Sequence, residues 1–216
     1  MDRSALTTDD GVVRPPRRIP TQARSRKRVE ALLDAASHLV VRDGVEALTT
    51  RTIATEATMP VASLYQYFAD KDAILLALVE RDMNAMDNQV EQDLAALHDA
   101  SLDAIVRTIM GAFVTIFQQR PAFIEIYLHG RTNAAVMDYC RAHNVGIALK
   151  LYDMAQSYSL LIPQARFANI RLAIEMGDRV LQVAFESDRN GDQLILSDGV
   201  ELITAYLRKY AQAPFH

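Results

Sequence analysis

The sequence predicts an all-α fold of about nine helices. Apolar residues recur at spacings of three and four along most of the 216-residue chain, which is the period of an amphipathic helix. No run alternates apolar and polar residues with the β-branched enrichment that is typical of strands. The eight glycines and seven prolines are also few for this length, which favours helices further.

Composition excludes several classes of protein. Half of the residues are hydrophobic and 23% are charged, so the chain has enough apolar material for a sizeable core. The longest uncharged apolar run, 73–79, is far shorter than the roughly 20 residues of a membrane-spanning helix. The first eight residues lack the apolar stretch of a secretory signal. The single Cys140 excludes an intramolecular disulfide and a cysteine-rich zinc site. We therefore expect a cytoplasmic protein with no membrane segment, no metal site and no cofactor.

Charge is distributed unevenly along the chain. The formal net charge of −4 alone would argue against a nucleic-acid partner. Between Arg14 and Arg28, however, there are seven basic residues and no acidic one, whereas the part from residue 76 onward has 12 basic and 17 acidic residues. This pattern is typical of a polyanion contact attached to a body with a different role. A solvated tail is the alternative.

The first helix follows a basic arm. Residues 1–20 carry three of the seven prolines and little apolar periodicity, so we expect this arm to be flexible. Helical patterning begins near Thr21 and stops at Gly44, a residue typical of helix C-termini. The apolar positions of this helix are Val29, Leu32, Leu33, Ala36, Leu39 and Val40.

Two short helices and a long one are expected next. Thr49 suits the N-cap of the first, because its hydroxyl can accept a hydrogen bond from an orphan amide of the next turn. Pro60 is tolerated only at the start of a helix, so a second short helix runs from Val61 to Tyr67. Asp70 then caps a long helix, which at about 1.5 Å per residue spans about 42 Å up to Leu97.

The rest of the pattern is helical as well. Ser101 caps a helix that continues through Phe117, and Pro121 opens a short helix that Gly130 closes. Three longer helices follow, at 133–159, 166–186 and 193–209.

The two short helices suggest a nucleic-acid partner. Two short helices joined by a short break, after a longer helix and a basic arm, form a helix-turn-helix arrangement, whose second helix can lie in the major groove of DNA. The run from Thr49 to Ala54, then Ala57, then the run from Ala62 to Lys71 closely resemble the signature of the TetR-type (TetR/AcrR) transcriptional regulators. The resemblance covers residues 22 to about 78.

The resemblance implies three parts of the chain. These are a flexible basic arm at 1–20, a helix-turn-helix DNA-binding domain at 21–70, and a helical ligand-binding and dimerisation domain at 71–216. Two positions depart from the family pattern, since Thr58 stands where the family usually has glycine and Pro60 where it usually has serine. A β-branched residue is disfavoured at positive φ, so we expect the turn to differ locally from that of the family.

The resemblance and the chemistry of the matched positions together assign contacts with a double-stranded DNA operator. Small residues at the start of the recognition helix let it sit deep in the groove, and Gln66 suits adenine readout. Arg51 and Lys71 would meet phosphates, and the arm would enter an adjacent minor groove. For Tyr67, packing is the alternative. The predicted DNA-binding residues are Arg24, Thr49, Arg51, Val61, Ala62, Ser63, Tyr65, Gln66, Tyr67 and Lys71.

The last two predicted helices are apolar on more than one face. One apolar stripe suffices for the core of a monomer, so a second stripe indicates burial against another copy in a four-helix interface. The family resemblance implies the same homodimer, whereas a larger monomer core is the alternative. We predict the dimer interface at Phe167, Ile170, Ile174, Leu181, Phe185, Leu196, Val200, Ile203 and Leu207, beside a second stripe that includes Leu172, Met176, Val180, Val183, Leu202, Tyr206 and Tyr210.

The resemblance also implies a small-molecule pocket between the long helix and the dimer helices. Apolar and aromatic side chains with a few polar anchors suit such a pocket, although ordinary packing uses the same residues. Glu125 and His129 lie four apart and share a helix face, where an ion pair that includes Arg131 is the alternative. The predicted ligand-binding residues are Met110, Phe113, Phe117, Glu125, Tyr127, His129, Met137 and Tyr152.

The expected function is that of a ligand-responsive transcriptional regulator. As a repressor it would bind a palindromic operator as a homodimer, and a small apolar or aromatic effector would shift the long helix and release the DNA. The sequence has no His-Glu-x-x-His motif, phosphate loop or nucleophile elbow, so no catalytic residue is predicted. Two alternatives stay open: an architectural DNA-binding protein without a ligand and, less favoured by the residues, an all-helical enzyme.

Overall fold

The computed structural model describes residues 19–98, 101–129 and 133–212. Within these ranges the chain forms nine helices and no strand, with one isolated bridge between Leu161 and Ala211, so the all-α prediction is confirmed. The predicted arm lies outside the described residues except for its last two positions, which open the first helix. The helices are α1 (Ile19–Asp43), α2 (Thr50–Glu56), α3 (Val61–Leu64), α4 (Lys71–Ala95), α5 (Leu102–Gln119), α6 (Pro121–His129), α7 (Ala134–Ser157), α8 (Phe167–Phe185) and α9 (Gln193–Arg208).

Helix boundaries follow local signals in the chain. The N-caps predicted at Thr49, Asp70 and Ser101 are confirmed, because each side chain accepts a hydrogen bond from the backbone amide three residues later. The start of α1 at Ile19 differs from the predicted start near Thr21. Proline is compatible with the first turn of a helix, so Pro20 does not delay the start.

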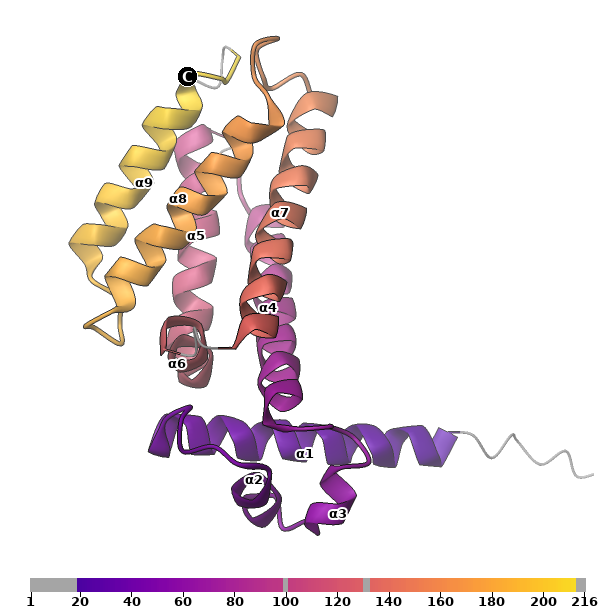
Figure 1. The fold of residues 1–216 in the computed structure, drawn as a ribbon. Helices are drawn as coiled ribbons and strands as arrows, with labels where there is room; N and C mark the ends of the chain where they lie inside the picture. Colours follow the sequence, from indigo (N-terminus) through magenta and orange to yellow (C-terminus); the bar gives the residue numbers. More distant parts are fainter. Residues whose placement is uncertain (1–18, 99–100, 130–132, 213–216) are drawn as a thin grey trace, which may run out of the picture.

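The helices form a head and a body (Figure 1). In the head, α1 lies across one end of the molecule with α2 and α3 beneath it. The long α4 leads from the head into the body, where it packs on α5 and α7, and α8 packs on both α7 and α9. The short α6 lies between the body and the head and contacts α1, α4 and α5.

One apolar core runs through both parts. In the head it contains Ile53, Ala54, Leu64 and Phe68, while Ala57 is half-buried and packs against it. It continues along α4 to the rings and aliphatic side chains of the body. Within the described ranges, none of the helices combines the length and the apolar character that crossing a membrane takes.

Candidate nucleic-acid interface and effector region

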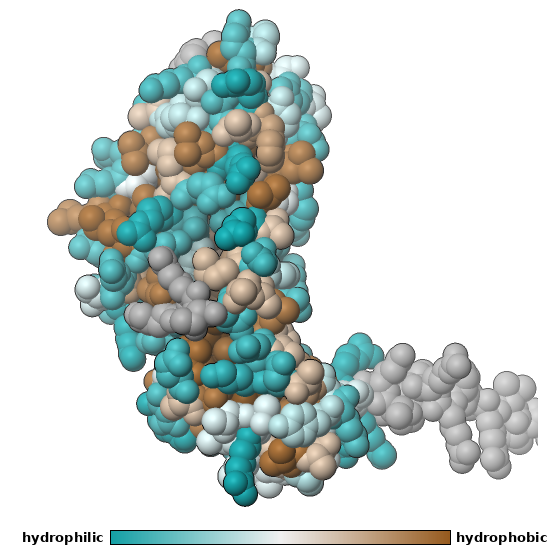
Figure 2. All heavy atoms as spheres, in the orientation of Figure 1, coloured by the Kyte–Doolittle hydropathy of each residue, from teal (hydrophilic) through white to brown (hydrophobic). Residues whose placement is uncertain are grey.

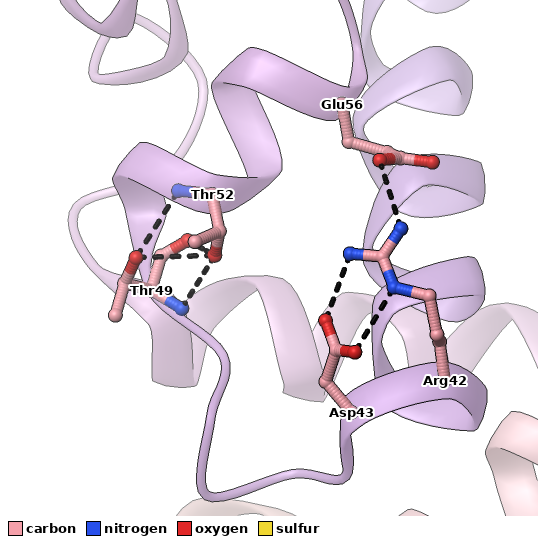
Figure 3. Close-up of polar contacts among 5 residues, drawn as sticks. All are labelled: Arg42, Asp43, Thr49, Thr52 and Glu56. Carbon is pink, nitrogen blue, oxygen red and sulfur yellow. Dashed lines mark hydrogen bonds and ion pairs between the residues drawn. The ribbon is translucent and has the colours of Figure 1, made fainter.

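The start of α2 is fixed by two threonines (Figure 3). Thr49 Oγ1 accepts a hydrogen bond from the Thr52 amide at 3.1 Å, and Thr52 Oγ1 accepts one from the Thr49 amide at 3.0 Å. This reciprocal pair satisfies two orphan donors, as a capping box does. It holds Thr49 and the neighbouring Arg51, two predicted DNA contacts, on a rigid first turn.

An arginine joins the ends of α1 and α2 (Figure 3). Arg42 donates to both carboxylate oxygens of Asp43, at 3.0 and 2.8 Å, and its Nη1 lies 3.6 Å from Glu56 Oε2. The hydrogen bonds from Arg42 hold the pKa of Asp43 below its ordinary value. Because these side chains are exposed, the ion pairs contribute little to the stability of the fold.

The turn between α2 and α3 keeps a left-handed residue. The Thr58 amide donates to Thr55 O at 3.0 Å and the Met59 amide to Ala54 O at 2.8 Å, which is the Schellman pattern of a helix C-terminus. Thr58 has φ +52°. The expectation of a locally different turn is therefore wrong: the six-residue hydrogen-bond pattern holds the conformation that glycine normally takes, and Thr58 adopts it despite its branched side chain.

The recognition helix begins at Val61, after Pro60, and is short. Pro60 occupies the N-cap without a side-chain hydrogen bond, and the helix ends at Leu64 rather than at Tyr67. Beyond Leu64 the Gln66 and Tyr67 amides bond carbonyls three residues back, at 3.2 and 2.9 Å, so the chain continues in tight turns. These turns bring Phe68 into the core beside the fully buried Leu64.

The predicted DNA-binding residues separate into two groups by exposure. Val61 and Tyr67 pack partly against the core, which is the alternative that the sequence left open for Tyr67. Within the described residues, no acidic side chain forms an ion pair with Arg51 or Lys71, so their charges are available to a partner. The exposed residues are Arg24, Thr49, Arg51, Ala62, Tyr65 and Gln66, and the half-buried ones are Val61, Ser63, Tyr67 and Lys71.

One contact in this region has no signal in the sequence. The Tyr65 ring is 54% exposed, and its hydroxyl lies 3.1 Å from Thr50 Oγ1 on α2. The two residues are 15 positions apart, so neither spacing nor residue type predicts the pair. Thr50 orients the Tyr65 phenol, which remains free to accept or donate on its outer side.

The comparison with known proteins decides the family. Residues 32–78, which include α2, α3 and the turn between them, match the model of the bacterial regulatory proteins of the tetR family. The helix-turn-helix part of the chain matches the TetR family. A curated relative from Xanthobacter autotrophicus, an uncharacterised HTH-type transcriptional regulator, is 28% identical over 120 residues, which are 54% of this chain and 59% of the relative.

Two further likenesses cover different shares of the chain. The nicotine-responsive repressor HdnoR of Paenarthrobacter nicotinovorans is 33% identical over 88 residues, 40% of this chain and 43% of that protein. The chain thus spans only about half the length of the curated relatives it matches. A TetR-family regulator structure from Streptomyces coelicolor matches with a TM-score of 0.64 and 24% identity, covering 84% of this chain and 98% of that one. This likeness shows the fold.

In the body of the molecule the predicted ligand residues fall into different places. Phe117 is buried, and its ring centroid lies 5.4 Å from that of Phe123, 6.2 Å from that of Tyr127 and 5.0 Å from that of Phe185. We call these four rings the ring cluster. Met110 is buried and Phe113 half-buried on α5, and Met137 is half-buried on α7.

Among three further predicted ligand residues, the described side chains make none of these ring contacts. Glu125 Oε1 lies 3.7 Å from Arg189 Nη2. Tyr152, near the far end of α7, packs edge-on against Phe167 with the centroids 6.1 Å apart. The side chain of His129 and all of Arg131 lie outside the described residues.

Sequence reasoning missed Asp178, which lies on α8 against the ring cluster. The Tyr127 hydroxyl donates to Asp178 Oδ1, and Gln182 Nε2 donates to Asp178 Oδ2 at 2.9 Å. Burial raises the pKa of Asp178 to about 6. The sequence does contain a signal for Asp178. It lies four residues after Ile174 and three before Leu181, so it is a charged residue on a helix stripe that is otherwise apolar.

A second missed acid, Asp82, joins the head to the body. It is 1% exposed, and its Oδ1 accepts from Arg120 Nη1 at 2.7 Å and from Arg81 Nε at 3.4 Å. Arg81 also pairs with Asp34 on α1, at 2.7 Å. Burial outweighs the two guanidinium groups and raises the pKa of Asp82. No group of three or more metal-ligating side chains suited to a metal ion occurs among the described residues.

The structure corrects the predicted dimer interface. Six of its residues are buried inside the subunit and have almost no surface to offer a second copy, whereas Phe167, Ile174 and Leu207 are half-buried. The stripe that faces outward is the neighbouring one. The buried six are Ile170, Leu181, Phe185, Leu196, Val200 and Ile203.

Apolar side chains are instead exposed on the outer side of α8 and α9. Leu172 is 49% exposed, Val183 38%, Leu194 76% and Leu202 56%, and we call these four residues the α8–α9 face. Figure 2 shows hydrophobic residues gathered at the surface on this flank of the body. The two helices are closely apposed, since a Cβ at Gly199 would lie 2.3 Å from a Val180 methyl carbon.

Proposed function

We propose that this protein is a transcriptional repressor that binds a palindromic DNA operator as a homodimer and releases it on binding a small-molecule effector. The observation that supports this most directly is the capped α2–α3 unit, whose exposed Arg51, Tyr65 and Gln66 surround a recognition helix with small residues at its start. The family match covers the same residues. Because its target is chromosomal DNA, the protein works in the cytoplasm.

Each element of the head has a role in this proposal. The start of α3 enters the major groove, where the exposed Ala62 approaches base edges and Gln66 reads adenine. Arg51 and Lys71 neutralise phosphates on either side of the groove, and Tyr65, oriented by Thr50, donates to another. Arg24, exposed near the start of α1, extends the contact toward the next groove.

The α8–α9 face forms the dimer in this proposal. Exposed leucines on two packed helices gain burial against their symmetry mates, which gives a four-helix interface. A two-fold dimer presents two recognition helices to successive major grooves, about 34–36 Å apart, and therefore reads a near-palindrome. This interface replaces the buried stripe that the sequence indicated.

The body binds the effector in this proposal. A relative that shares part of the sequence is nicotine-responsive, which supports a small molecule as the signal for this chain as well. The ring cluster and Asp178 supply the apolar wall and the polar anchor that small-molecule sites combine.

Selection of bound duplexes from a random-sequence pool tests the proposal. We expect the full chain to enrich a near-palindrome whose half-sites are centred one helical turn apart or a multiple of it. Preference for no sequence over random DNA contradicts an operator-binding regulator and favours an architectural role. Absence of duplex binding at low ionic strength contradicts both.

Lys71→Ala tests the interface on the selected duplex. We expect weaker binding to every sequence by a similar factor, and a salt dependence whose slope falls by about 1, because one phosphate contact is lost. Lys150→Ala, an exposed lysine on α7, is the matched control and should change neither quantity. An unchanged slope for Lys71→Ala removes this residue from the contacts.

A further inference from the structure

Asp178 is an acid in an apolar setting. Its two oxygens accept hydrogen bonds from neutral donors, Tyr127 and Gln182, and within the described residues no cationic side chain forms an ion pair with it. Arg179, the next residue on α8, bonds the far side of Gln182 at 3.0 Å. Loss of water outweighs the hydrogen bond from Gln182 and the charge of Arg179, and it raises the pKa of Asp178.

The surroundings of Asp178 suit one class of ligand. Tyr127 belongs to the ring cluster, so aromatic faces and edges lie beside the carboxylate. The residue before Asp178, Gly177, lies close to Met110, because a Cβ at Gly177 would be 3.5 Å from the Met110 sulfur. A carboxylate among rings and a thioether attracts a cation by ion pairing and by cation–π contact. It repels an anion and offers a neutral apolar molecule no charge compensation.

We propose that Asp178 anchors an organic cation, an amine or quaternary ammonium group carried on an apolar or aromatic frame. This inference rests on the proposed effector function and narrows its effector to one chemical class. The cation pairs with the Asp178 carboxylate, and its apolar part packs against the ring cluster. Since these rings are closely packed without the ligand, the cation displaces the Tyr127 hydroxyl from Asp178 when it binds.

Displacement of Tyr127 can affect the head through α6. The hydrogen bond between Tyr127 and Asp178 joins α6 to α8, and α6 also packs on α1, the first helix of the head. A cation that breaks this bond frees α6 from α8 and alters its contact with α1. The binding of the cation is thereby coupled to the position of the α2–α3 unit.

Matched pairs of probes test the ligand class with the full chain. The cations are benzyltrimethylammonium, (2-phenylethyl)trimethylammonium and tetrabutylammonium, and each is compared with its uncharged isostere in which carbon replaces nitrogen. We expect at least one cation to raise the melting temperature and to lower the affinity for the selected duplex at least tenfold, while its isostere does neither. If no cation binds better than its isostere, the inference is wrong.

Asp178→Asn keeps the acceptor for Tyr127 and removes the charge. We expect this variant to lose at least tenfold in affinity for the cation. Asp153→Asn, an exposed acid on α7, is the matched control and should bind the cation unchanged. Equal cation binding by Asp178→Asn and the unmodified chain contradicts the site.

Tyr127→Phe separates the anchor from the coupling. The variant lacks the hydroxyl that competes for Asp178, so we expect it to bind the cation several-fold more tightly; weaker binding contradicts the displacement. The cation's effect on the melting temperature is read without DNA. Failure of duplex selection therefore contradicts the proposed function alone, whereas loss of the preference for charge with duplex binding intact contradicts this inference alone.

Discussion

Thr58 carries the strained backbone of the helix-turn-helix unit. Its φ of +52° lies in the left-handed region, where a β-branched side chain crowds the following carbonyl. Two backbone hydrogen bonds of the Schellman turn hold it there. The turn sets the angle between α2 and α3, so this local strain is the cost of a fixed recognition geometry.

Thr58→Gly relieves that strain. We expect the free energy of unfolding to rise by about 1 kcal/mol, as the steric cost removed exceeds the added entropy of the unfolded chain. Urea unfolding measures it. Thr55→Gly, one turn earlier with helical geometry, should lower the same quantity by roughly 0.5 kcal/mol. If both variants are destabilised, Thr58 is not strained.

Asp178 makes stability depend on pH in an identifiable way. Its pKa is raised from 3.8 to about 6, so the folded state binds a proton that the unfolded state has already released between these values. The contribution of Asp178 to stability is therefore most favourable below pH 4, falls as the pH rises to 6 and is constant above that. The groups that face it are Tyr127 from α6 and Gln182 and Arg179 from α8.

Asp178→Asn removes this dependence. Allowing for the partial exposure of the side chain, we expect the variant to be more stable than the unmodified chain by about 2 kcal/mol at pH 7 and nearly equal to it at pH 3.5. Urea unfolding from pH 3.5 to 7.5 gives the difference directly. A difference that does not change across this range contradicts a raised pKa.

At the scale of helices, Asp82 is the junction of three elements. It lies on α4, pairs with Arg120 at the end of α5, and shares Arg81 with Asp34 on α1. The two ends of the ion pair with Arg120 differ in burial, because the Asp82 side chain is 2% exposed and that of Arg120 is 34% exposed. Removing Asp82 and removing Arg120 should therefore change the free energy of unfolding by different amounts.

Arg120→Ala should cost more than Asp82→Asn. The first change leaves a buried carboxylate with a single weaker partner and should lower the free energy of unfolding by about 3 kcal/mol. The second leaves guanidinium groups that reach water, and we expect a loss of about 1 kcal/mol. Arg107→Ala, in an exposed pair with Asp103, is the control and should cost less than about 0.5 kcal/mol. The reverse order of the first two contradicts this account.

Local signals explain how much of the fold the sequence predicts. Thr49, Asp70 and Ser101 each act within three residues of themselves, so their caps and the helices after them are predictable from the chain alone. Periodicity shows that α8 has two apolar stripes, but it does not show which stripe faces inward, because that depends on where α5, α7 and α9 lie. For this reason the sequence did not show that six of the nine predicted interface residues are buried inside the subunit.

The same distinction separates the parts of the candidate sites. Arg51 and Lys71 follow from a motif that is contiguous in the chain, whereas Tyr65 meets Thr50, and Asp178 meets Tyr127, only after folding. The charge of Asp178 on an apolar stripe marks it as unusual, but its partner 51 residues away has no signal in the sequence.

At the scale of the whole molecule, the dimer interface proposed on the α8–α9 face predicts the oligomeric state of a variant. Leu202→Glu places a charge in the proposed interface, so we expect a monomer at micromolar concentration and loss of tight operator binding, because two half-sites are no longer read together. Analytical ultracentrifugation measures the mass. Leu149→Glu on α7 is the control, since Leu149 is 50% exposed against 56% for Leu202. If the Leu202→Glu variant is still a dimer, the interface does not lie on the α8–α9 face.

The contacts of α6 also constrain how the molecule can move. α1 packs on α4, α4 on α6, and α6 on α1, so these three helices touch pairwise and close a triangle. A chain of two contacts can bend at its middle member without disturbing its ends, but a closed triangle cannot. Any displacement of α6 must therefore shift α1 or α4. Because α1 is part of the head, a movement of α6 in the body is transmitted to the head.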